Sequence, residues 1–311
     1  MSLREDITNT IIRIIESGAA RGSSSPLWDA GVSLGLPVNF STRLAYSGIN
    51  VPLLWGAAQE RALERNEWLT FKQALALGGS VRKGSKGVLC AFFKVTTRGD
   101  SGNAKGGSDS TNSGRGEALM PMPMPMPMLK PFWLFNVADL DGLAIAPATA
   151  AIAAGFDPVE RAEQLLARTG VPITWGGTRA FYRPSTDEIF LPSRERFTSP
   201  TNAYAVALHE ATHSTGHPSR LARDFGKRFG TDAYAFEELV AELGSAFLLA
   251  HLGLVGARLE HHASYIASWL RVLRSDPTAV FAASRPASAA FRFPVGGESE
   301  EDTAEPEFLA A

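Results

Sequence analysis

The stretch Ala205-Val-Ala-Leu-His209-Glu210-Ala-Thr-His213-Ser-Thr-Gly216 carries the pattern H-E-x-x-H inside an apolar segment. On a helix, two histidines four residues apart lie on one face, about one turn from each other. Two neutral imidazoles at that spacing can bind one Zn²⁺, and the glutamate after the first can act as a general base in hydrolysis. The stretch therefore predicts a metal-binding helix over about residues 201–215, ended by Gly216 and Pro218. The alternative is two histidines on a helix surface.

The third metal ligand decides the class of site. A metzincin would place a histidine three residues after the glycine, but that position is Ser219, and His217 follows Gly216 directly, which excludes the class. A second apolar helix further along carries two glutamates one turn apart, Glu238 and Glu242. We expect Glu238 to bind the metal and Glu242 to orient a histidine from outside the ligand shell, with the reverse order open. The alternative is an acidic helix face in water.

Composition and charge place the chain in a broad class. At 311 residues it is longer than a typical single domain, and 45% of its residues are hydrophobic. Residues 1–98 carry a net charge of +5 and the remainder −7, so the front half favours a polyanionic partner. Cys90 is the only cysteine, which excludes a disulfide framework and a cysteine-based zinc site. With no run of 18 apolar residues, we expect a cytoplasmic protein without a membrane span.

Periodicity and turn signals predict an α+β chain of two domains. The first, at 1–145, is a small α+β domain with helices at 6–17, 51–66 and 70–77 and strands at 88–95 and 131–137. Residues 97–130 contain a Met-Pro repeat that suits neither a helix nor a sheet, so we expect a disordered insertion there. The repeat's methionines could instead form a metal or partner site.

The remaining boundaries follow from the same signals. Residues 146–157 are the expected linker, 158–283 the second domain, and 284–311 a disordered tail rich in Ala, Pro and acidic residues. A hairpin is expected at 180–192, before the metal-binding helix. Its second strand, Glu188 to Leu191, is the expected site for an extended substrate beside that helix.

Two blocks of the sequence resemble a known family. In the front half, Tyr46-Ser-Gly-Ile-Asn50, Trp68-Leu-Thr-Phe71-Lys72-Gln73, the glycine-rich segment 78–87 and residues 132–137 resemble the N-terminal domain of ArdC-type antirestriction proteins, a domain that TraC-type plasmid primases also contain. In the back half, residues 209–221 and 237–243 resemble the zincin-like metallopeptidase domain that follows it there. The resemblance implies a single-stranded DNA-binding module joined to a metallopeptidase-like domain, carried by conjugative plasmids or related mobile elements and associated with protecting incoming DNA from restriction.

This resemblance gives the front-half residues a chemical role. Binding single strands without sequence preference requires cations for phosphates and flat rings for stacked bases. A hairpin at 82–87 concentrates three cations with no acidic residue close in sequence, so we expect phosphate contacts there. Tyr46 is the favoured stacking ring, whereas Trp68 and Phe71 are expected in the core, and Asn50 either contacts DNA or fixes a turn. The expected DNA-binding residues are Arg43, Tyr46, Asn50, Lys72, Arg82, Lys83 and Lys86.

The leading hypothesis is a single-stranded DNA-binding protein with a metallopeptidase site. His209, His213 and Glu238 would bind Zn²⁺, or another divalent metal, while Glu210 acts as base and His217 or Tyr234 stabilises the oxyanion. The expected partners are single-stranded DNA and a protein substrate. Two alternatives stay open: a DNA-binding protein whose metal only stabilises the fold, and an intracellular protease for which DNA is a tether.

Overall fold

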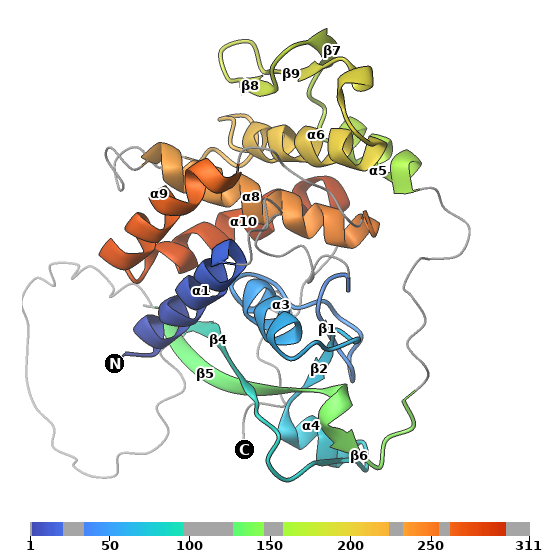
Figure 1. Ribbon diagram of the computed structural model, residues 1–311, viewed down its shortest axis with the longest axis vertical. Coiled ribbons are helices and arrows are strands. Elements are labelled where there is room, and N and C mark those ends of the chain that lie inside the picture. Colours follow the sequence, from blue (N-terminus) through green and yellow to red (C-terminus); the bar gives the residue numbers. More distant parts are fainter. Residues whose placement is uncertain are drawn as a thin grey trace, which may run out of the picture.

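The computed structural model describes residues 2–20, 34–95, 127–145, 158–223, 233–254 and 262–296. In Figure 1 the front half, blue to green, forms a mixed layer of helices and strands, and the back half stacks its helices above it under a small sheet. The linker expected at 146–157 lies outside the described residues, as does the predicted insertion up to residue 126.

A four-stranded sheet with the order β1-β2-β5-β4 forms the centre of the front half. Its longest ladder joins β4 and β5 antiparallel, from Val88 opposite Leu134 to Val95 opposite Pro127. The described elements of this half are α1 (Leu3–Ala20), β1 (Val38–Asn39), α3 (Asn50–Glu60), β2 (Glu67–Leu69), α4 (Phe71–Ala76), β3 (Ser80–Val81), β4 (Val88–Val95), β5 (Pro127–Asn136), the 3-10 helix η1 (Val137–Asp139) and β6 (Leu140–Asp141).

Two sequence predictions about β4 and β5 have different outcomes. The predicted strand over residues 88–95 is confirmed as β4. The expected disorder up to residue 130 is wrong for its last four residues, because β5 begins at Pro127. Proline is tolerated there because it is the first residue of the strand, where a missing N–H costs least.

The short helix α4 begins as its sequence indicates. The side chain of Thr70 accepts a hydrogen bond from the backbone N–H of Gln73, and the side chain of Gln73 accepts one from the N–H of Thr70. This reciprocal capping box satisfies two donors that the first turn of a helix leaves free. The cap predicted at Thr70 is confirmed, and the preceding Trp68 is fully buried, as expected.

The back half combines a small sheet with a stack of helices. Its elements are α5 (Pro158–Arg168), β7 (Ile173–Gly177), β8 (Phe181–Arg183), β9 (Glu188–Pro192), the 3-10 helix η2 (Arg194–Arg196), α6 (Pro200–Ser214), α8 (Ala233–Leu252), α9 (His262–Ser275) and α10 (Ala279–Val295). The sheet order is β7-β9-β8. Because β9 is paired on both sides, the expectation that it holds an extended substrate is wrong, and β7 and β8 are the two edge strands of this sheet among the described strands.

The last described helix corrects the predicted tail. Residues 284–295, expected to be disordered, belong to α10, which packs along α8. The helix tolerates Pro286 in its interior, and three of its alanines, Ala283, Ala287 and Ala290, are fully buried. Small side chains allow close approach, since a Cβ placed at Gly244 of α8 would lie 3.5 Å from the carbonyl oxygen of Ala287.

The two halves are in direct contact. Residues of α1 share one cluster of buried apolar side chains with α8, α9 and α10, and Thr8 donates a hydrogen bond to the carbonyl of Pro277 at 2.7 Å. The N–H of Gly48 donates to the hydroxyl of Ser288 at 2.9 Å. Figure 1 shows α1 lying between α3 and these helices. The front half therefore buries part of its apolar surface against the back half.

Among the described helices, none combines the length and the apolar character that crossing a bilayer requires.

Candidate metal centre

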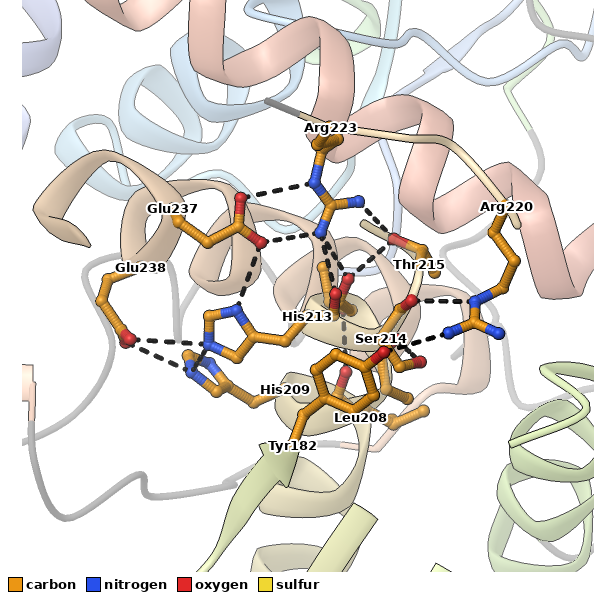
Figure 2. A network of polar contacts seen from close by, with 12 residues as sticks. Tyr182, Leu208, His209, His213, Ser214, Thr215, Arg220, Arg223, Glu237 and Glu238 are labelled. Atoms are coloured by element: carbon orange, nitrogen blue, oxygen red, sulfur yellow. Dashed lines mark hydrogen bonds and ion pairs between the residues drawn. The ribbon is translucent and has the colours of Figure 1, made fainter. Parts of the chain in front are cut away.

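The two histidines of the motif project from α6 toward one point. Ser199 caps this helix by accepting a hydrogen bond from the N–H of Asn202, and Pro200 occupies its first turn. The Nε2 atoms of His209 and His213 lie 3.2 Å apart. The helical spacing thus aims both lone pairs at the same small volume (Figure 2).

Glu238 on α8 completes a three-residue cluster. One of its carboxylate oxygens lies 3.5 Å from Nε2 of His209, and the other lies 3.5 Å from Nε2 of His213. Tetrahedral ligands at about 2.0–2.2 Å from a metal are separated from each other by roughly 3.3–3.6 Å. The two 3.5 Å separations fall within that range and the 3.2 Å between the histidines lies just below it, so the donor set fits a single divalent ion. Among the described residues, this trio is the group with metal-binding spacing.

The charge around His209 also favours a cation. Burial on its own would lower the pKa of this histidine, but the carboxylates of Glu238, Glu210 and Glu242 outweigh it and raise the pKa to about 9. The Glu238 carboxyl, despite burial that opposes ionisation, has its pKa lowered by the two histidines. The site therefore holds excess negative charge unless a proton or a metal neutralises it.

A different glutamate lies near the Nδ1 nitrogen of each histidine, the ring nitrogen that is not part of the cluster. A carboxylate oxygen of Glu242 lies 3.7 Å from Nδ1 of His209, beyond hydrogen-bond distance. Glu237, which the sequence analysis did not consider, lies 3.2 Å from Nδ1 of His213. Glu237 in turn accepts a hydrogen bond of 2.7 Å from Arg223, as Figure 2 shows. The signal available in the sequence was the carboxylate directly before Glu238, one helix position from the expected ligand.

Gly216 makes room for that arginine. A Cβ at this position would lie 3.0–3.2 Å from the guanidinium atoms of Arg223. The guanidinium also donates to the carbonyl of Thr212 at 2.8 Å, which ties it to the end of α6. Besides its predicted place at the end of the helix, Gly216 therefore allows the close packing of Arg223.

An open cleft of about 1100 Å³ lies over the trio. Glu210, next to His209, lines it, as do His217 and Tyr234, the two residues considered for oxyanion stabilisation. Tyr234 is 64% exposed and lies one helical turn before Glu238. The edge strand β8 contributes Phe181 and Tyr182 to the same wall. The cleft thus brings a carboxylate, a phenol and an imidazole to one place, next to a strand edge that no described strand pairs with.

A second ion pair fixes β8 beside α6. Arg220 donates to Asp187 at 2.9 Å and to the hydroxyl of Tyr182 at 3.3 Å, and its Nε donates to the carbonyl of Ser214 at 2.8 Å. Hydrogen bonds from Arg220 lower the pKa of Asp187 to about 2, against the opposing effect of burial. The turn between β8 and β9 is therefore tied to the chain that follows α6.

The structure separates the predicted DNA-binding residues into two groups. Tyr46, expected to be an exposed stacking ring, is 6% exposed, and Asn39 donates a hydrogen bond to its hydroxyl at 3.1 Å. Asn50 is also buried, with its amide bonded in both directions to the backbone of Ala91. The expectation that these two side chains contact DNA is wrong, because both are buried and hydrogen-bonded within the fold.

The cations of the front half remain on the surface. Lys72, Lys83 and Lys86 are exposed, whereas Arg43 forms an ion pair with Glu67 at 2.8 Å. Arg82 pairs with Asp141 at 3.3 Å, a carboxylate far from it in sequence. The expectation of a hairpin at 82–87 is wrong, because β3 pairs with β6 and β4 with β5, so these residues form a loop between two sheets. Phe71, expected in the core, is 51% exposed.

Comparisons with known proteins also divide the chain into a front half and a back half. Residues 1–125 match the family of the N-terminal domain of the anti-restriction factor ArdC, and residues 160–286 match a family of zincin-like metallopeptidases, MPTase-PolyVal. A crystal structure of the antirestriction protein ArdC from plasmid R388, with bound Mn(II), is similar with a TM-score of 0.73 and 34% identity, over 95% of this chain and 97% of that one.

Two further relatives differ in length. The uncharacterized protein y4eC of Sinorhizobium fredii is 38% identical over 90% of this chain and 87% of its own. A DNA primase TraC of Escherichia coli is 36% identical over 96% of this chain, but the match spans only 27% of that primase.

Proposed function

The chain belongs to the ArdC family of antirestriction proteins, and on that premise we propose that it is a DNA-binding metallopeptidase that protects incoming DNA from restriction. Its front half binds single-stranded DNA, and its back half holds one divalent metal and hydrolyses a peptide bond. The names of its relatives, an antirestriction protein and a DNA primase, support DNA as the partner of the front half. They also support an origin on a mobile element.

The observation that carries the peptidase proposal is the convergence of His209, His213 and Glu238 at the floor of an open cleft. A site that only stabilised the fold would have no need of a carboxylate such as Glu210 in the cleft wall. A divalent metal bound by the trio would supply Lewis-acid chemistry, polarising a carbonyl and making a water more acidic. Zn²⁺ suits two imidazoles and a carboxylate, and Mn²⁺ is the ion in the ArdC structure.

The side chains around the trio have separable roles. Glu210 accepts a proton from the attacking water and returns it to the leaving amine. Tyr234 or His217 donates a hydrogen bond to the negative charge that develops on the carbonyl oxygen. The substrate lies extended along β8, whose outer edge has backbone groups free to pair with a peptide.

Glu210→Gln tests the enzymatic part. The variant should keep the metal and the fold, because Gln has nearly the same shape, and should lose at least 100-fold in hydrolysis of a pooled fluorogenic peptide library. Glu195→Gln, an exposed glutamate in η2, is the matched control and should behave like the wild type. Full antirestriction activity in Glu210→Gln would show that hydrolysis is dispensable and would favour the DNA-binding alternative.

Salt dependence tests the DNA-binding part. Each phosphate contact on a single strand contributes about 0.7 to the slope of log K against log salt. Replacing both Lys83 and Lys86 by Ala should flatten that slope by about 1.4 for every oligonucleotide sequence. Replacing two exposed arginines of the back half, Arg168 and Arg271, removes the same charge and should leave the slope unchanged. An unchanged slope in the double lysine variant would place the DNA-binding surface elsewhere.

A further inference from the structure

Trp133 is an exposed aromatic ring on the front half. It lies on β5 and is 54% exposed, whereas Trp55, Trp68 and Trp269 are at most 1% exposed. Its partner across the β4–β5 ladder is Leu89, which comes two residues after the end of the basic loop at 82–87. Indole rings are highly buried on average, so an exposed one beside a cationic loop indicates a contact surface.

The ring packs against the loop backbone at Gly87. A Cβ added there would lie 3.3 Å from Cε3 of Trp133 and 3.1 Å from Cζ of Phe135. The backbone therefore passes close to both rings, and glycine provides the space. Lys86 is the residue directly before this contact, and its side chain is exposed.

The loop at 82–87 is held in position by two arginines. Arg82 donates to the carbonyl of Ala138 and pairs with Asp141 at 3.3 Å, while Arg61 donates to the carbonyl of Lys86 at 3.4 Å. Lys83 and Lys86 have no ion-pair partner within the part of the chain that the structure describes, and both are exposed. Two arginines thus anchor the loop, and its two lysines remain available.

We propose that Trp133 is a base-stacking platform for single-stranded DNA and that Lys83 and Lys86 take the phosphates beside the stacked base. The inference rests on the DNA-binding function proposed above. It adds Trp133, which lies in the resembling stretch 132–137 but is not among the DNA-binding residues expected from the sequence. An unpaired base exposes its π-face, whereas a duplex hides its faces in the stack, so the site selects single strands. The charge of the two lysines complements phosphate and offers nothing to a neutral apolar partner.

The test measures binding of the full chain to two oligonucleotides, oligo(dT) and an abasic strand with the same number of phosphates. Trp133→Ala should weaken oligo(dT) binding by about 5- to 150-fold, the range expected for loss of one base–aromatic stack. It should leave abasic-strand binding and the salt slope unchanged, since it removes no charge. Trp133→Phe should retain most of the affinity, and Phe293→Ala, an exposed ring on α10, should match the wild type.

The outcomes are distinguishable. Equal loss on both strands, or a Trp133→Phe variant as weak as Trp133→Ala, would overturn stacking in favour of a structural role. Wild-type affinity in Trp133→Ala, with the double lysine variant still weakened, would overturn this inference and leave the proposed DNA binding intact. A wild-type chain that binds neither strand would remove the proposed DNA-binding function and this site with it.

Discussion

A carboxylate oxygen of Glu237 lies 3.2 Å from Nδ1 of His213, on the side of the imidazole opposite the metal-binding nitrogen. This contact fixes the orientation of the ring and the tautomer that leaves Nε2 free to bind a metal. Arg223 keeps the Glu237 carboxyl ionised, since its pKa is lowered by hydrogen bonds from His213 and Arg223 although burial opposes this.

Glu237→Gln should therefore weaken metal binding by about 10- to 100-fold, the usual loss when an outer carboxylate is removed. The amide keeps the size of the side chain, so the circular dichroism spectrum should not change. Competition with a metal-binding dye measures the affinity, and Glu195→Gln serves as the control. An affinity within twofold of the wild type would show that Glu237 does not position His213.

Close packing of α6 and α8 should be sensitive to one methyl group. A Cβ at Gly244 would lie 2.6 Å from the methyl carbon of Thr212, whose hydroxyl is held by a 2.8 Å hydrogen bond to the carbonyl of Leu208. Gly244→Ala should therefore destabilise the fold by about 1–3 kcal/mol in urea unfolding. Adding Thr212→Ser removes the methyl group, keeps the hydroxyl and should restore most of the loss. Absence of that rescue would mean that the strain lies elsewhere.

Asp187 should contribute to stability in a pH window set by its ionisation. Because its folded pKa of about 2 lies below the ordinary value of 3.8, its contribution is present above pH 3.8 and is lost as pH falls through 2. Asp187→Asn should lower the free energy of unfolding at pH 7 by about 1 kcal/mol, a modest value because the side chain is 33% exposed. The difference between variant and wild type should shrink toward zero near pH 2. A constant difference would contradict the assignment.

Tyr46→Phe separates a structural role from a DNA contact. The variant removes the hydroxyl that accepts a hydrogen bond from buried Asn39, so it should cost about 1 kcal/mol of stability. Its affinity for single-stranded DNA should equal that of the wild type, measured by fluorescence anisotropy well below the melting temperature. Lost affinity in a folded variant would return Tyr46 to the DNA-binding surface.

Local signals in the sequence predicted several elements well. Thr70 and Gln73 form a cap from side chains three residues apart, and the apolar run from Val88 to Val95 is bounded by Gly87. Both patterns depend on nearest neighbours along the chain, so they can be recognised without the tertiary structure.

Features that depend on distant contacts could not be predicted in this way. From the sequence, Pro286 and the surrounding alanines predict a disordered tail. They form a helix because they pack against α8, a contact that local sequence does not indicate. Tyr46 lies in a polar turn, and its burial follows from contacts with segments far along the sequence. Whether β8 or β9 lies at an edge of the sheet depends on β7. This strand precedes the β8–β9 hairpin in the sequence and pairs with β9, which leaves β8 at an edge.

The central claim is that one divalent metal is bound by His209, His213 and Glu238. Metal stoichiometry of the purified full-length chain, measured by mass spectrometry after dialysis against Zn²⁺ or Mn²⁺, tests it most directly for the wild type, Glu238→Gln and Glu242→Gln. The account predicts about one ion per chain in the wild type and in Glu242→Gln, and almost none in Glu238→Gln. A full ion in Glu238→Gln, or its loss only in Glu242→Gln, would contradict the account.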